Sequence, residues 1–351
     1  MEYKKLGDIA TYINGYAFKP EDRGEEGLPI IRIQDLTGNS YDLGFYDGEY
    51  PEKIEINNGD VLISWSASLG VYVWTRGKAL LNQHIFKVVF DKIDIDKSYF
   101  VYAVRRKLDD IVSKTHGATM KHIVKKDFDA TQIPYPSLEE QAKIASKLDR
   151  VSRIIKSRNE ELEKLDELIK ARFVEMFGDV VLNTKKWENY TWDNVLTIKN
   201  GKNQKDVENP KGIYPICGSG GIMNYADDYI TESNSVIIGR KGNINNPILM
   251  REKFWNVDTA FGLEPNTTVL NVDYLFMFCN FFDFEILNKA VTIPSLTKAD
   301  LLKIIIPIPP IELQNQFAEF VKQVDKSKVV VQKALDEAQI LFDSLMQEYF
   351  G

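Results

Sequence analysis

The chain has 351 residues, of which 44% are apolar and 27% charged, and its formal net charge is −7 at pH 7. This length and apolar content predict two or three domains with buried cores and exclude wholesale disorder. The apolar runs fall short of the roughly 18 residues that a transmembrane helix needs, so none is expected. The acidic balance argues against a simple polyanion binder, because a nucleic-acid surface on this chain would be a local patch.

The N-terminus and the cysteines indicate a reducing compartment. The sequence MEYKKLGDIA lacks the apolar stretch of a signal peptide. Cys217 and Cys279 are too few for a disulfide framework, and with three histidines they give no metal-ligand spacing. We therefore expect a cytoplasmic protein without a metal site and without a membrane partner.

Residues 1–136 predict an α/β module. A short amphipathic segment at 6–10 is followed by an Asn-Gly turn at 14–15, and residues 29–33 and 59–64 have the pattern of apolar strands. A helix is expected over residues 99–108.

Residues 137–178 predict a long amphipathic helix. Pro134 and Pro136 hold the preceding chain extended, Ser137 with Glu140 forms a capping box, and Gly178 ends the helix. Apolar residues recur in steps of three and four, the period of a coiled-coil seam. The seam of this helix contains Ile144, Leu148, Val151, Ile155, Leu162, Leu165, Ile169 and Met176.

The second half of the chain repeats this order, with a module over residues 179–309 and a long helix over 310–351. The second helix matches the first without a gap at a shift of 173 residues, including the prolines before it and the Phe-Gly pair at its end. Its seam contains Phe317, Val321, Val324, Val331, Leu335, Phe342, Leu345 and Tyr349. Arg158, Arg172 and Lys328 interrupt the seams, where we expect them to snorkel or to form local ion pairs.

The two modules also match, more weakly. Residues 59–64 correspond to 234–239, and residues 82–86 to 257–261. Antiparallel helices let the second module close compactly, whereas parallel helices would force it to span roughly 60 Å. The predicted fold is therefore α+β: two tandem α/β modules held apart by two long antiparallel helices that form a coiled coil, with a pseudo-two-fold internal repeat.

This pattern resembles the specificity subunit of type I restriction–modification enzymes, over nearly the whole chain. The resemblance depends most on the motif I-P-x-P-x-x-E-x-Q-x-x-I/F-A, which stands at the start of each long helix, at 133–145 and 306–318. The Phe-Gly pair at the end of each helix adds to it. The resemblance implies that each module is a target-recognition domain for one half of a split double-stranded DNA sequence. It also implies that the helices set the gap between the half-sites and dock two methyltransferase subunits, and that a translocase–nuclease subunit joins for restriction. S-adenosylmethionine, ATP and magnesium are then expected in the partner subunits and not in this chain.

Polar and basic side chains on the expected loops are the candidates for DNA contact, because amides, imidazoles and cations read base edges or neutralise phosphates. The first module offers Ser64, Trp65, Ser66, Asn82, Gln83, His84, Arg105, Arg106, Lys107, Lys121, His122, Lys125 and Lys126. The second module offers Asn203, Gln204, Lys205, Ser219, Arg240, Lys241 and Asn243. Such residues are also common on ordinary solvated turns, so the loops carry more weight as groups than as single residues.

The motifs of nucleotide-using enzymes are missing from the sequence. It contains no G-x-x-x-x-G-K-[ST] loop and no Asn-Pro-Pro-Tyr-like methyltransferase motif, and the glycines at 218–221 lack dinucleotide-fingerprint spacing. We therefore expect a non-catalytic subunit. Two alternatives stay open: a stand-alone two-headed DNA-binding protein, which the acidic balance disfavours, and a coiled-coil adaptor whose modules bind proteins, which the difference between the modules disfavours.

Overall fold

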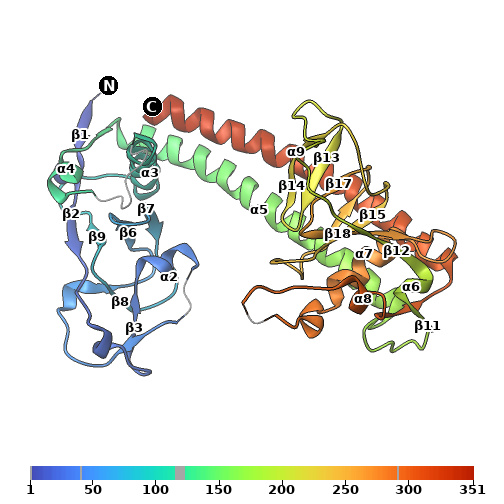
Figure 1. Cartoon of the computed structure of the whole chain (residues 1–351). Helices are drawn as coiled ribbons and strands as arrows, with labels where there is room; N and C mark the ends of the chain where they lie inside the picture. The colour runs from blue at the N-terminus through green and yellow to red at the C-terminus, as the bar shows by residue number, and fades with distance from the viewer. Residues whose placement is uncertain (1, 40–41, 115–122, 291) are drawn as a thin grey trace. The chain divides into compact units, whose positions relative to one another are not determined.

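The computed structural model describes residues 2–39, 42–114, 123–290 and 292–351. The chain divides into two compact units: Met1–Ser157 with Ala334–Gly351, and Arg158–Lys333. Each unit contains one module and part of both long helices, α5 (Leu138–Phe177) and α9 (Ile311–Phe350) (Figure 1). No described helix is both long and apolar enough to cross a membrane.

The first unit is built around a four-stranded antiparallel sheet and a second four-stranded sheet whose strands are mostly shorter. The main sheet has the order β2 (Thr11–Asn14), β9 (Ile85–Val89), β6 (Val61–Ser64), β7 (Gly70–Val73). The second sheet has the order β4 (Phe45–Tyr46), β3 (Leu28–Ile31), β8 (Ala79–Leu81), β5 (Glu55–Ile56). A two-stranded sheet pairs β1 (Tyr3–Lys5) with β10 (Gln132–Pro134), and the helices are α1 (Leu6–Ile9), α2 (Ile33–Thr37), α3 (Lys97–Lys114) and α4 (Lys125–Ala130).

The second unit has the same plan. Its main sheet has the order β12 (Leu196–Asn200), β18 (Ala260–Pro265), β15 (Ser235–Gly239), β16 (Ile248–Met250). Its second sheet has the order β14 (Gly221–Ala226), β13 (Tyr214–Gly218), β17 (Trp255–Asn256). A two-stranded sheet pairs β11 (Glu188–Thr191) with β19 (Ile305–Ile308), and the helices are α6 (Trp192–Val195), α7 (Val272–Phe281) and α8 (Lys298–Leu301).

The repeat extends to single contacts. The Tyr99 hydroxyl on α3 donates to the Pro134 carbonyl at 2.9 Å, and the Tyr274 hydroxyl on α7 donates to the Pro307 carbonyl at 2.7 Å. Both Asn-Gly turns rest on backbone: a Cβ on Gly15 would lie 2.0 Å from the Asn82 carbonyl oxygen, and one on Gly201 1.7 Å from that of Val257. Both turns therefore require glycine, for the same steric reason.

The two long helices pair antiparallel within each unit, which confirms the predicted arrangement. In the first unit the beginning of α5 shares a core with the end of α9, where Leu148 and Phe350 belong to one cluster. In the second unit the end of α5 meets the beginning of α9, and the rings of Phe173 and Phe317 lie 5.3 Å apart between centroids.

Every residue of the two predicted seams is buried or half-buried. The residues that interrupt the seams form ion pairs: Arg158 with Glu161 and Arg172 with Glu175 within α5, and Lys328 with Asp166 across the two helices. The predicted module boundaries at residues 136, 178 and 309 stay a prediction, because the division into compact units runs through the middle of both helices.

A buried glutamine ties the start of each long helix to its module. The Gln141 amide donates to the Pro136 carbonyl at 2.9 Å and accepts from the Asp96 backbone N–H at 3.0 Å, directly before α3. Gln314 repeats both bonds, with the Pro309 carbonyl at 2.8 Å and the Asn271 N–H at 2.8 Å, directly before α7. Both side chains are fully buried. Each glutamine thus fixes a helix start against the module helix that packs on it.

Replacing either glutamine with alanine is expected to destabilise its own unit. The substitution leaves a buried N–H and a buried carbonyl without partners, which costs about 1–3 kcal/mol. The measurement is denaturant unfolding of the full chain, with Gln339→Ala as the control because the exposed Gln339 bonds only to Asp343 among the described residues. The control should change stability by less than about 0.5 kcal/mol. A Gln141→Ala variant as stable as the wild type would show that these bonds do not hold the helix start.

Candidate nucleic-acid interface

Most of the candidate loops lie where the two central strands of the main sheet end, at the same end of the sheet in each module. The last residue of β6, Ser64, pairs with the first residue of β9, Ile85, so the segments that flank this pair share an edge. In the second module Gly239 pairs with Ala260 in the same way. We call residues 65–68 and 82–84 the first edge, and residues 240–243 and 257–259 the second edge.

The two edges have the same backbone frame. The Trp65 N–H donates to the His84 carbonyl at 3.2 Å, and the Arg240 N–H donates to the Thr259 carbonyl at 2.8 Å. The Trp65 carbonyl then accepts from the Ile123 N–H at 3.0 Å, and the Arg240 carbonyl from the Leu296 N–H at 2.9 Å. Trp65 and Arg240 therefore occupy equivalent positions and carry different chemistry.

The first edge forms one wall of a groove whose other wall is α2. The groove has a volume of about 400 Å³ and brings the predicted Asn82, Gln83 and His84 next to Gln34 and Asn39. The His84 Nδ1 is buried and has no hydrogen-bond partner among the described residues. The groove thus presents amide and imidazole groups of the kind that read base edges.

Sequence reasoning missed the α2 wall of this groove. Residues 29–33 were expected to be a strand, but β3 ends at Ile31 and a short helix begins at Ile33. The sequence does carry a signal for it, since Gly38 provides the left-handed position that closes the helix and polar side chains follow at once.

The second edge is completed by a hairpin. Ser219, at the turn between β13 and β14, has its Cβ 3.1 Å from where a Cβ on Gly239 would stand. Lys241 and Asn243 are exposed and Arg240 is half-buried. The structure therefore brings four predicted residues together. The loop with Asn203, Gln204 and Lys205 is anchored at its start to β17, where the Trp255 indole donates to the Lys202 carbonyl at 3.0 Å.

Trp65 and Arg240 lie on equivalent phenylalanines. The Trp65 ring stacks on Phe86 at 5.6 Å between centroids, and its indole N–H donates to the Asn14 side chain at 3.2 Å. The Arg240 guanidinium lies 5.9 Å from the centre of the Phe261 ring and donates to the Asp258 carbonyl at 3.3 Å.

Several candidates lie elsewhere. Ser64 is fully buried and its hydroxyl donates to the Ser68 carbonyl, which removes it from the exposed candidates. The Arg106 guanidinium donates to the Gln347 side chain, and the Lys107 ammonium donates to the Phe350 carbonyl at 3.0 Å. These two cations hold the C-terminal end of α9, which lies beside α3. A cation at this position is favourable because it meets the helix's unpaired carbonyls.

The remaining basic candidates of the first module are dispersed. Arg105 lies over the Tyr102 ring at 5.5 Å and lines a groove against α5. Lys125 pairs with Asp129 at 2.7 Å, and Lys126 is exposed on α4. Ser66 is half-buried at the first edge. Lys121 and His122 lie outside the described residues.

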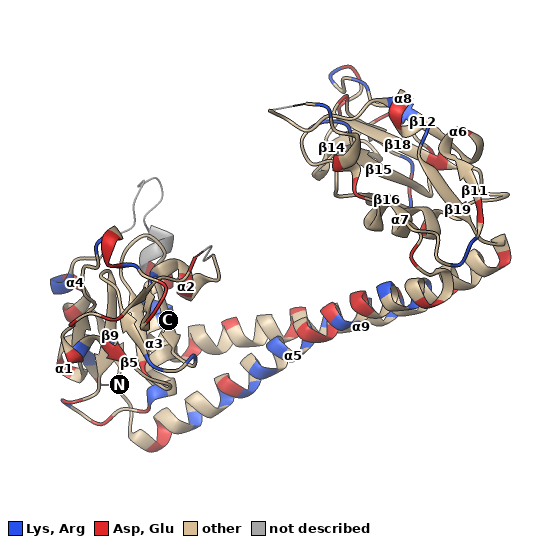
Figure 2. Cartoon of the chain, turned by 90° about the horizontal axis from the view of Figure 1, so that it is seen from below, with Lys and Arg blue, Asp and Glu red and all other residues tan. Residues whose placement is uncertain are grey.

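Acidic and basic residues are interspersed along both long helices (Figure 2). Cys217 and Cys279 are free and buried, and burial raises the pKa of the Cys217 thiol to about 12. Burial also raises the pKa of Tyr102, and the hydrogen bond to Asp149 adds to the shift. No cluster of metal-ligating side chains occurs within the described ranges.

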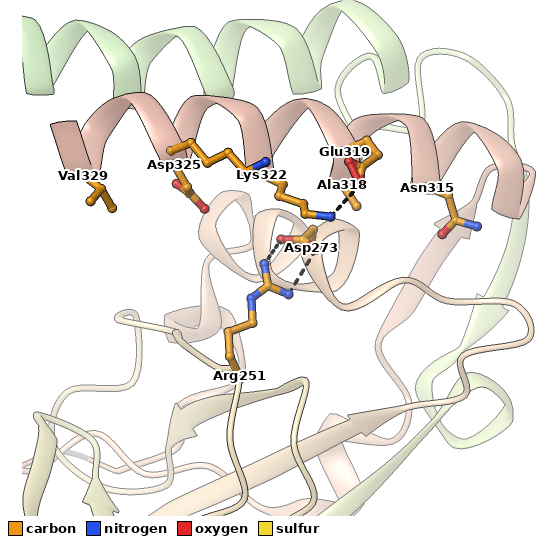
Figure 3. A pocket seen from close by; sticks show the side chains of 9 residues that line it. Arg251, Asp273, Asn315, Ala318, Glu319, Lys322, Asp325 and Val329 are labelled. Carbon is orange, nitrogen blue, oxygen red and sulfur yellow. Dashed lines mark hydrogen bonds and ion pairs between the residues drawn. The ribbon is translucent and has the colours of Figure 1, made fainter. Parts of the chain in front are cut away.

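A second groove, of about 580 Å³, lies in the second unit against α9 (Figure 3). Arg251 and Asp273 form a two-pronged ion pair on one side, with 3.2 Å between Nη1 and Oδ2. Lys322, Asp325 and Val329 project from α9 on the other side. The groove is therefore lined mainly by charged side chains, with one exposed valine from α9.

Comparisons with known proteins identify the family of the chain. The family model described as "Type I restriction modification DNA specificity domain" matches residues 1–165 and again 184–338. The chain belongs to this family.

This chain covers different shares of its relatives' lengths. The EcoBI specificity subunit of Escherichia coli is 30% identical over 168 residues, which is 47% of this chain but only 35% of that relative. The MjaIX specificity subunit of Methanocaldococcus jannaschii is 24% identical over 414 residues, which covers 98% of this chain and 91% of the relative. The crystal structure of a type I S subunit from M. genitalium shares the fold, with a TM-score of 0.65 at 16% identity over 100% of this chain and 96% of that one. This likeness confirms the predicted pair of tandem domains.

Replacing Lys107 with alanine is expected to destabilise the first unit by about 0.5–1.5 kcal/mol, because a carbonyl at the end of α9 loses its charged donor. Thermal unfolding of the full chain measures this loss, with the exposed Lys126→Ala as the control. If Lys107→Ala keeps wild-type stability but binds duplex DNA more weakly, Lys107 contacts DNA and does not serve the helix end.

Proposed function

We propose that this chain is the DNA-specificity subunit of a type I restriction–modification complex and that each module reads one half of a bipartite target. One observation carries the proposal: the two edges share a backbone frame and present different side chains from it. A reader of two different half-sites needs this arrangement, because the frame sets how DNA is approached and the side chains select bases.

The acidic balance of the chain fits a subunit that shares its DNA with partners. Phosphate contacts dominate non-specific affinity, and this chain has few basic clusters to supply them. Methyltransferase subunits bound beside the modules would supply these contacts. The chemistry would also reside in the partners, so that S-adenosylmethionine, ATP and magnesium bind there, and a translocase–nuclease subunit would join for restriction. This role places the protein in the cytoplasm.

The long helices are the proposed docking surface for two methyltransferase subunits. Val329 and its neighbour Val330 on α9 are 70% and 69% exposed, and Val329 lines the groove of Figure 3. Apolar side chains on a helix that is already paired contribute little to the fold and much to an interface. One solved structure with this fold, at 17% identity and a TM-score of 0.57, bears a title on complex assembly of the type I R-M system.

Exchanging residues 1–132 for the corresponding module of another family member should change one half of the methylated sequence and leave the other half and the gap unchanged. The measurement is methylation of a random-sequence DNA library by the chain with its methyltransferase subunit. A change in both halves would show that the modules do not read independently. If the chain binds no DNA with or without a methyltransferase subunit, the adaptor alternative is favoured.

Replacing Val329 and Val330 with glutamate should weaken co-purification of the methyltransferase subunit at least tenfold, because two charges would be buried in the interface. Leu182→Glu is the matched control, since Leu182 is 74% exposed in the loop after α5. Equal co-purification of both variants would place the docking surface elsewhere on the chain.

A further inference from the structure

The position shared by Trp65 and Arg240 is where the two edges differ most in chemistry. Their own backbone N–H and carbonyl groups make equivalent hydrogen bonds, and both side chains lie over an equivalent aromatic ring, Phe86 or Phe261. The frame is thus constant while the group that it presents changes from an indole to a guanidinium.

Arg240 has the surroundings of a base reader. Lys241 and Asn243 follow it on an exposed loop, and Ser219 stands beside that loop. Among the described residues, the Asp258 carbonyl is the one acceptor for the Arg240 side chain, at 3.3 Å. A guanidinium has five donors, so this single bond orients the group without using most of its capacity. The Phe261 ring supports it from one side.

Trp65 has a different role at the same position. Its one donor is given to Asn14, and its ring lies between His84 at 4.9 Å and Phe86 at 5.6 Å. The indole therefore fills the edge and supports His84, which lines the α2 groove. In the first module the polar groups that remain for reading belong to α2 and to residues 82–84.

We infer that Arg240 is a specificity-determining residue that reads a guanine in the half-site of the second module. Arginine forms a two-pronged hydrogen bond to the O6 and N7 of guanine in the major groove, which no other base offers. The first module has no counterpart of this contact at Trp65 and selects its bases from the α2 groove. The inference rests on the proposed function, because it concerns the same DNA-reading surface.

The test is the methylated sequence produced by variant complexes from a random-sequence DNA library. Arg240→Gln and Arg240→Ala should each lose the preference for guanine at one position of one half-site by tenfold or more, because the glutamine amide matches adenine instead and alanine has no donor. The other half-site and the gap should be unchanged, which shows in the same experiment that the complex is folded and active.

Two further variants separate base reading from general affinity. Lys241→Gln should lower methylation evenly across sequences without changing the preferred bases, as expected for a phosphate contact. Lys303→Gln, at an exposed position in the segment between α8 and β19, should match the wild type.

Three outcomes would contradict either the role of Arg240 or the proposed function. An unchanged preference in both Arg240 variants, or an even loss of methylation at all sequences, would overturn the role of Arg240 and leave the proposed function standing. If the wild-type complex itself gives no two-part sequence, the proposed function is wrong, and the role of Arg240 that rests on it is wrong as well.

Discussion

The packing of two helix halves against each other and against a module is the interaction on which each unit depends. Neither helix belongs to one unit alone, since each contributes its beginning to one core and its end to the other. A helix of 40 residues with one apolar stripe is stable only when that stripe is covered, and here the other helix covers it. The buried glutamines then fix where each module meets its helix.

This dependence explains why the repeat is strict in the helices and loose in the modules. A change in the helix register would disturb Gln141, Gln314 and the aromatic cluster of Phe173 and Phe317 together. The side chains of the loops at the module edges are not constrained in this way, because backbone hydrogen bonds and glycine turns hold the loop backbone in place. Side chains at the edges can therefore vary while the architecture stays the same.

Much of this architecture could be predicted from the sequence, and the exceptions have physical causes. The helices were predictable because a seam period over 42 residues and its copy at a fixed shift leave few other folds. The additional burial of Phe173, Phe177 and Phe350 was not predicted, since these residues lie off the seam and face the modules. Periodicity within a helix shows one stripe but not a second surface that a module covers.

The candidate site could be predicted in outline only. Sequence pattern located the segments at the two edges, because polar residues that follow a buried strand must leave the core. It could not tell that Ser64 points inward or that Lys107 ends on a helix carbonyl, because both depend on contacts with residues distant in the sequence or on the turn that follows. The α2 wall was missed because Ile33 continues the apolar run of the strand before it.

We infer that one plan written twice produces two independent readers of DNA. The most direct measurement is to map the methylated sites in cells that express this chain together with its methyltransferase subunit. We expect two short specified blocks with different sequences, separated by an unspecified gap of constant length. A single continuous block, or two blocks whose separation varies from site to site, would contradict it.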